Sequence, residues 1–164
     1  MKKLLIVLTV AIVLMSSAAM AQSTTTLQVT VAAQASISVT TGTTSMTNST
    51  AFGNYSGTTN FTYSVRTTNT TGSGSITMSM PNFSQAGGPS VTGLTYGCSM
   101  GATGTACSGT GNAVSISTSL PVATFAAGAH ATGQSGSVTW ALTDNPSWAV
   151  GTYTTTVTYT ISAA

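Results

Sequence analysis

The chain has 164 residues, and only 2% of them are charged, against roughly a quarter in an average soluble protein. Three are Lys or Arg, one is Asp or Glu, and one is His. Paired carboxylates for acid–base catalysis, a basic groove for nucleic acid and an acidic metal cage all need residues that this composition lacks. We therefore expect no enzyme, no cofactor or metal site and no nucleic-acid partner.

Residues 1–21 have the pattern of a secretory signal peptide. Two lysines precede an apolar run over residues 4–15, and residues 19–21 form a cleavage site of the Ala-x-Ala type. The run is short for a bilayer span of about 20 residues. We expect cleavage between Ala21 and Gln22, and no integral membrane segment in the mature chain.

The remaining residues, 22–164, are expected to form one domain of ordinary size. We divide them into an N-terminal extension, residues 22–33, and a folded domain, residues 34–164. Arg66 and Asp144 cancel in charge. A net charge near zero favours association, because nothing repels a second copy.

Apolar residues in the first half alternate with polar ones, and this period of two predicts strands. The pattern from Leu27 to Val39 predicts strands over 24–31 and 35–40, or one long strand with a weak middle. Similar alternation predicts a strand over 61–65 and another over 76–80, which Pro81 ends.

In the second half, alternation over 138–142 predicts a strand that ends at the turn signal Asp144-Asn145-Pro146. Residues 128–136 are expected to be a loop, and residues 153–161 predict the last strand. Helical spacing is lacking, and about eight or nine short strands separated by turns are typical of an all-β, immunoglobulin-like antiparallel β-sandwich.

Two cysteines, Cys98 and Cys107, are separated by small residues. An even number of cysteines in a secreted chain predicts a disulfide. Closing so short a loop should stabilise the fold by about 2.5–3 kcal/mol in the chain-entropy model. We expect the bridge to hold a loop between two strands.

Both ends of the mature chain resemble known secreted subunits. Residues 27–39, followed by Phe52-Gly53-Asn54-Tyr55, resemble the start of fimbrial-type subunits, including the spore coat protein U family and related pilin-like domains of Gram-negative bacteria. Residues 151–161 are similar to the terminal strand of chaperone–usher pilins, which begins Gly-x-Tyr. The early cysteine common in those families is absent.

The resemblance implies an incomplete sandwich that a strand from the next subunit completes, with main-chain hydrogen bonds for affinity and alternate side chains for register. The candidate donor residues are Leu27, Val29, Val31 and Ala33. The candidate acceptor wall is the C-terminal strand, through Tyr153, Val157, Tyr159 and Ile161. In the alternative, residues 24–31 are the first strand of a closed sandwich in the same chain, and periodicity does not distinguish the two.

His130, Trp140 and Trp148 are three further candidates for a functional role. His130 is expected in a loop, because a catalytic triad would need Asp144 to orient it and a serine that no nucleophile-elbow motif singles out. Trp140 alternates with buried positions and is expected in the core. Trp148 follows a turn, where it either contacts a glycan or, as such a tryptophan does more often, covers the end of the sandwich.

The leading hypothesis is a structural subunit of an extracellular fibre, a pilus or fimbria, that assembles by strand donation. Its expected partners are copies of itself, a periplasmic chaperone and an outer-membrane usher, and its expected location is the periplasm in transit and then the cell surface. The alternatives are a closed-sandwich protein of a spore coat or matrix and a carbohydrate-binding adhesin that uses Trp148.

Overall fold

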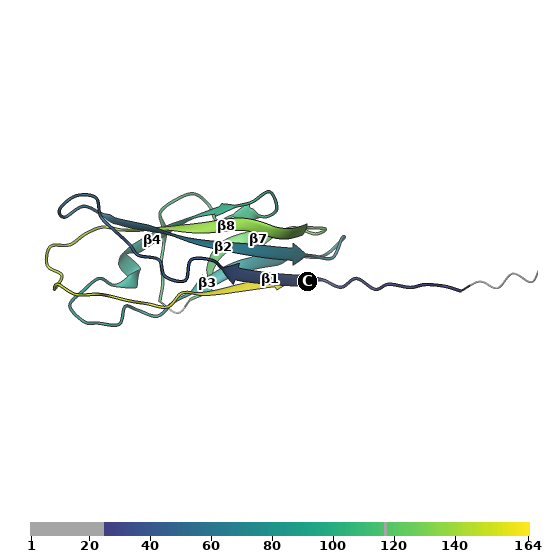
Figure 1. The fold of residues 1–164 in the computed structure, drawn as a ribbon, viewed down its shortest axis with the longest axis horizontal. Coiled ribbons are helices and arrows are strands. Elements are labelled where there is room, and N and C mark those ends of the chain that lie inside the picture. Colours follow the sequence, from purple (N-terminus) through teal and green to yellow (C-terminus); the bar gives the residue numbers. More distant parts are fainter. Residues whose placement is uncertain (1–24, 117) are drawn as a thin grey trace, which may run out of the picture. The chain divides into compact units, whose positions relative to one another are not determined.

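The computed structural model describes residues 25–116 and 118–164 (Figure 1). Strands dominate this part of the chain, as predicted, and one short 3-10 turn is present. The elements are β1 (Gln34–Val39), β2 (Tyr55–Arg66), β3 (Gly74–Ser79), η1 (Val91–Gly93), β4 (Leu94–Met100), β5 (Thr105–Ala106), β6 (Asn112–Ala113), β7 (Leu120–Phe125), β8 (His130–Leu142) and β9 (Thr158–Ala163).

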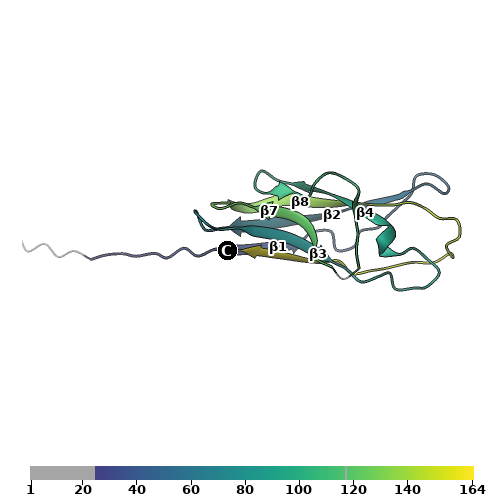
Figure 2. The same cartoon turned by 180° about the vertical axis from the view of Figure 1, so that it is seen from behind.

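The strands form two antiparallel sheets that pack face to face (Figures 1 and 2). One sheet has five strands in the order β1-β2-β8-β4-β6, and the other has four in the order β5-β7-β3-β9. The predicted all-β sandwich is therefore confirmed.

The core lies between the sheets and follows the alternation of the sequence. On β2 the side chains of Phe61, Tyr63 and Val65 are buried, while their even-numbered neighbours point outward. On β8 the predicted core residue Trp140 is buried, and its Nε1 donates a hydrogen bond to Thr59 Oγ1 at 2.9 Å. An inward face of apolar side chains on each sheet is what makes the two sheets pack.

The predicted disulfide between Cys98 and Cys107 is present, with a Cα–Cα distance of 5.5 Å. Cys98 lies in β4 of the five-stranded sheet, and Cys107 directly follows β5 of the four-stranded sheet. The Cys107 amide also donates a hydrogen bond to the Val122 carbonyl on β7. The bridge therefore joins the two sheets covalently along one side of the sandwich.

The prediction of a loop over residues 128–136 is wrong for residues 130–136, and only residues 128 and 129 lie outside a strand. His130 is the first residue of β8, and residues 130–136 pair with the end of β2. This segment is rich in Gly, Ser and Thr and lacks the apolar alternation that marks a strand. A long neighbouring strand supplies the ladder of main-chain hydrogen bonds, for which apolar side chains are not needed.

Candidate functional site

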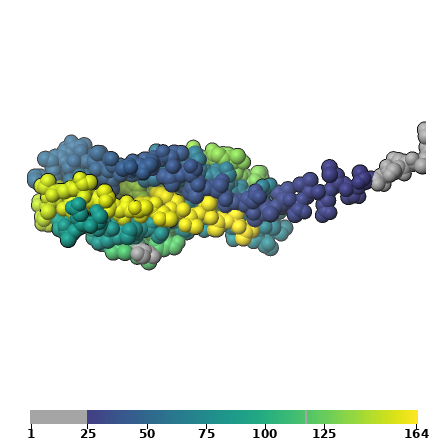
Figure 3. Space-filling view, turned by 60° about the horizontal axis from the view of Figure 1, so that its bottom comes forward, coloured from purple at the N-terminus to yellow at the C-terminus, as the bar shows by residue number. Residues whose placement is uncertain are grey.

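The side of the sandwich opposite the disulfide carries two edge strands. β1 pairs only with β2, and β9 pairs only with β3. The two strands are neighbours along this side, which we call the β1–β9 seam (Figure 3). Neither strand hydrogen-bonds to the other, so each presents an unpaired row of main-chain N–H and C=O groups, the usual template for another strand.

The inward face of the C-terminal segment is only partly covered. Three of the predicted acceptor residues, Val157, Tyr159 and Ile161, are half-buried and pack against the core. On the neighbouring strand β3, by contrast, Ile76 is 0% exposed. The seam therefore exposes apolar surface that the interior of the same sheet hides.

Tyr153, the fourth predicted acceptor residue, is also half-buried, but it lies among loops, where its hydroxyl donates a hydrogen bond to the Ala149 carbonyl. The predicted last strand over 153–161 is therefore wrong for residues 153–157, because β9 begins at Thr158.

The other wall of the seam comes from β1 and the segment that follows it. Ile37 and Met46 are partly buried and pack against the core. The segment after β1 continues along β2, because Thr47 and Ser56 exchange two main-chain hydrogen bonds of 2.9 Å. Both walls of the seam thus combine half-covered apolar side chains with a free strand edge.

Tyr159 lies in β9, on the wall of the seam that the C-terminal segment forms. Its ring centroid is 5.7 Å from that of Phe61, and its hydroxyl is buried without a hydrogen-bond partner. Burial raises the pKa of Tyr159 to about 12, and the nearby Thr59 hydroxyl offsets only part of this rise. The Thr59 hydroxyl accepts a hydrogen bond from Trp140 Nε1 and shares another, of 2.6 Å, with Thr44 Oγ1.

The predicted strand over 24–31 does not form within the described residues of this chain. Residues 25–33 belong to no strand, whereas the following prediction, over 35–40, corresponds to β1. The side chains of Leu27, Val29 and Val31 are 92%, 77% and 62% exposed. Ala33, the fourth candidate donor residue, is half-buried. An extended segment with three alternating, exposed apolar side chains has thus no partner strand among residues 25–164.

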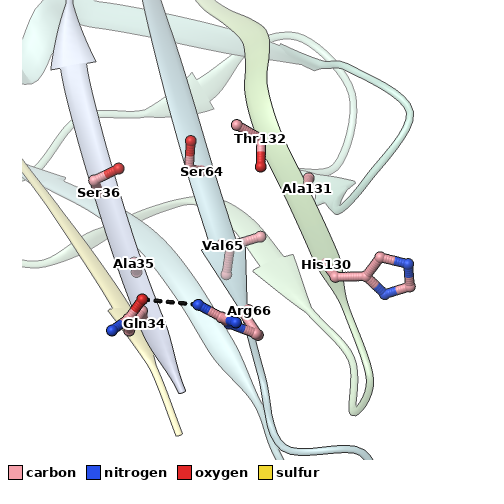
Figure 4. Close-up of a pocket in the computed structure, with 9 residues that line it drawn as sticks. All are labelled: Gln34, Ala35, Ser36, Ser64, Val65, Arg66, His130, Ala131 and Thr132. Carbon is pink, nitrogen blue, oxygen red and sulfur yellow. Dashed lines mark hydrogen bonds between the residues drawn. The ribbon is translucent and has the colours of Figure 1, made fainter. Parts of the chain in front are cut away.

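A separate recess of about 650 Å³ lies where β1 begins and β2 ends (Figure 4). Gln34, Arg66 and His130 are consecutive cross-strand neighbours on β1, β2 and β8, and Ser36, Ser64 and Thr132 lie beside them. The Arg66 Nη2 donates a hydrogen bond to Gln34 Oε1 at 2.8 Å. The ring of His130 points away from the other lining side chains, with its Nδ1 2.9 Å from the Gly128 carbonyl oxygen.

The structure separates the residues from which a catalytic triad or an internal ion pair would be built. Tyr55 pairs with Leu142 at one end of β2, and Arg66 pairs with His130 at the other. Asp144 follows Leu142 by two residues and so lies at the end remote from both Arg66 and His130. Among the described residues no three metal-ligating side chains come together.

Trp148 is partly buried and packs against the core. Its amide donates a hydrogen bond to the Asn145 carbonyl at 3.0 Å, which fixes it in the turn after β8. This arrangement is the one expected of a tryptophan that covers the end of a sandwich.

The expected cleavage site, Ala21 and Gln22, lies outside the described residues, as does the rest of the predicted signal peptide. Within residues 25–116 and 118–164 no helix is long and apolar enough to cross a membrane.

Sequence reasoning missed two parts of these sites. The alternation around Ile37 predicts only a strand, and no pattern marks Met46, because their place in the seam depends on which strands are edges. The recess was missed because Arg66, Gln34 and Thr132 come together only through the register of three strands. Composition gave one signal for it, namely that Arg66 is the single Arg or Lys after residue 3.

Comparison with known proteins adds no relative: no protein-family model matches the sequence, and no curated protein and no solved structure matches it significantly.

Proposed function

We propose that this chain is a structural subunit of an extracellular fibre, in which the N-terminal extension of one copy inserts as a strand into the β1–β9 seam of the next. The observation that carries the proposal is the coexistence, in one chain, of two half-covered edge strands, each with one free edge, and an exposed alternating segment. The edge strands lack a neighbouring strand, and the exposed segment lacks a sheet to pair with. Strand addition to a free edge is a common mode of recognition.

The geometry of the chain favours insertion into a second copy over insertion into its own seam. The extension leads directly into β1 at Gln34, with Ala32-Ala33 before it. To pair with its own β1, the chain would have to reverse direction there. A tight reversal calls for residues such as Asn-Gly or Gly that tolerate a positive φ, and this position has none.

The spacing of side chains suits the seam. In an inserted strand, Leu27, Val29 and Val31 would point to one face at intervals of about 6.5–7 Å. The inward residues of β9, such as Tyr159 and Ile161, repeat at the same interval, because they too alternate along a strand. Covering them at about 25 cal/mol per Å² of apolar surface gives the main driving force.

Secretion through the signal peptide, a periplasmic chaperone that protects the seam, and an outer-membrane usher belong to the same proposal. An edge strand that exposes apolar surface is prone to uncontrolled pairing. A chaperone that covers the strand until assembly would prevent this aggregation. The near-absence of charge fits a subunit that packs against copies of itself.

The test is a charge placed on either face of the extension. The protein secreted from cells expressing the full chain is compared with Val29→Asp/Val31→Asp and with the matched control Gln28→Asp/Thr30→Asp, which adds the same charge on the other face. We expect fibres in negative stain and heat-resistant ladders on gels for the wild type and the control, and neither for the first variant. A wild-type protein that stays monomeric, or equal assembly of all three, would contradict strand donation.

A further inference from the structure

The recess at the start of β1 holds the only Lys or Arg side chain of residues 25–164. Arg66 is exposed, and its hydrogen-bond partner, the side-chain oxygen of Gln34, is neutral. The guanidinium is therefore held in place without an opposite charge from a side chain. Gln34 fixes it by one N–H and leaves other N–H donors to bind a further group.

The surroundings of Arg66 suit a carboxylate. The hydroxyls of Ser36, Ser64 and Thr132 lie in the same recess (Figure 4). Ser64 stands at the irregularity in the pairing of β2 with β8, and its Oγ accepts a hydrogen bond from the Gly133 amide at 3.0 Å, which leaves its proton to donate. A planar guanidinium binds carboxylates with two parallel hydrogen bonds, and the three hydroxyls lie farther along the same strands of the recess.

The only Asp or Glu side chain of this chain lies at the opposite end of the same sheet. β2 is twelve residues long and spans roughly 35–40 Å at about 3.3 Å per residue. Asp144 follows β8 at the far end and begins a turn in which the Asn145 Oδ1 accepts hydrogen bonds from the amide and hydroxyl of Ser147. Asp144 is half-buried and leads into this hydrogen-bonded turn.

We infer that the Arg66 recess binds the Asp144 turn of a second copy, so that one ion pair joins successive subunits head to tail. This inference rests on the proposed function. In a fibre whose copies all share one orientation, the Gln34 end of each copy faces the Asp144 end of its neighbour. Any contact of like ends would bring two arginines or two aspartates together, so the pair selects the polar, head-to-tail array.

A single exposed ion pair adds little affinity, and its main effects are on orientation and on the rate of encounter. Arg66 and Asp144 are the only Lys, Arg, Asp or Glu residues of residues 25–164. No third side chain of these types can therefore compete for either member of the ion pair. The effect should be strong at low ionic strength and should vanish in about 1 M salt, where the Debye length falls to about 3 Å.

The test uses Arg66→Glu, Asp144→Arg and the double variant, each secreted from cells expressing the full chain. Light scattering follows assembly at low and at high salt, and thermal melting checks that each variant folds. We expect each single variant to assemble about fivefold more slowly than wild type at low salt, the double variant to regain the wild-type rate, and all four proteins to agree at high salt.

Single variants that assemble at the wild-type rate in low salt, or a double variant no faster than the single ones, would overturn this inference. Such a result does not bear on strand donation, which the Val29→Asp/Val31→Asp variant and its control test separately. In a second experiment, free glucuronate is titrated into the wild type and into Arg66→Gln, and its binding to each is measured. Binding of glucuronate that requires Arg66, together with normal assembly of Arg66→Glu, would make the recess a site for acidic sugars and would also overturn the inference.

Discussion

At the scale of single residues, Tyr159 differs most from an ordinary core residue. Its ring packs on Phe61, yet its hydroxyl is buried without a hydrogen-bond partner. The nearby Thr59 hydroxyl accepts its hydrogen bond from Trp140 instead. Leaving a buried hydroxyl unsatisfied costs about 1–3 kcal/mol. Among the described residues this hydroxyl is the one buried side-chain oxygen or nitrogen without a partner, so it destabilises the fold locally at the seam.

Tyr159 should make the fold sensitive to alkali. Unfolded tyrosine loses its proton near pH 10, whereas the pKa of Tyr159 in the folded chain is about 12. Between these pH values the unfolded state binds fewer protons than the folded state, so stability falls as pH rises. Urea unfolding at pH 8 and pH 12 should show a loss of up to about 2–3 kcal/mol from this group, and Tyr159→Phe should lack that part of the loss.

At pH 8 the Tyr159→Phe variant should be at least as stable as the wild type, because it removes a hydroxyl that bonds to nothing. Tyr153→Phe is the control: the Tyr153 hydroxyl donates to the Ala149 carbonyl, and this variant should keep the alkaline loss that comes from Tyr159. Equal alkaline losses in wild type and Tyr159→Phe would show that the hydroxyl is not the cause.

The sequence pattern largely predicts which residues are buried. It does not predict which polar groups form hydrogen bonds with one another. The alternation around Phe61, Ile76 and Trp140 marked the inward face of each strand correctly, because side chains on a strand alternate by geometry. The contact of Thr44 with Thr59 depends on a loop folding back over β2. No local pattern encodes such a contact.

At the scale of elements, the disulfide and the seam occupy opposite sides of the sandwich. β4 and β5 are joined by the bridge from Cys98 to Cys107, while β1 and β9 lie side by side with no covalent bond and no ladder of hydrogen bonds between them. The side that is covalently closed should therefore resist opening, and the seam should be the side that separates to admit a strand.

Removing the bridge should destabilise the fold by about 2.5–3 kcal/mol, the value expected for closing a loop of about ten residues. Cys98→Ser/Cys107→Ser is the variant, and its urea midpoint is compared with that of the oxidised wild type. Wild type treated with a reductant should match the variant, because both lack the same cross-link. A loss below about 1 kcal/mol would mean that packing alone holds β4 and β5 together.

Pairing between elements was the part of the fold that the sequence did not encode locally. The apolar pattern over 24–31 is as good as that of β1, yet only residues 34–39 pair within the chain. Residues 130–136 have no such pattern and still form a strand, because β2 extends far enough to pair with them. Periodicity states that a segment suits a sheet and does not state which partner is available.

In the proposed fibre, each molecule as a whole provides both an acceptor and a donor, and these two roles should be separable. Val29→Asp/Val31→Asp disables the donor and leaves the seam intact, so this variant should be a monomer with a free acceptor. A synthetic peptide of residues 22–33 should then bind the seam and raise the melting temperature of the variant. Because the peptide binds only the folded state, the gain should be about 2.7 kcal/mol at about 100 times its Kd.

The matched control is the same peptide with Asp at positions 29 and 31, which keeps the backbone and loses the inward apolar face. It should leave the melting temperature unchanged, because a charge entering the seam would lie among Ile37, Val157 and Tyr159. Light scattering must show that the variant stays monomeric with either peptide. Stabilisation by neither peptide, in a variant that melts cooperatively, would mean that the seam is closed to strands and that Leu27, Val29 and Val31 serve another partner.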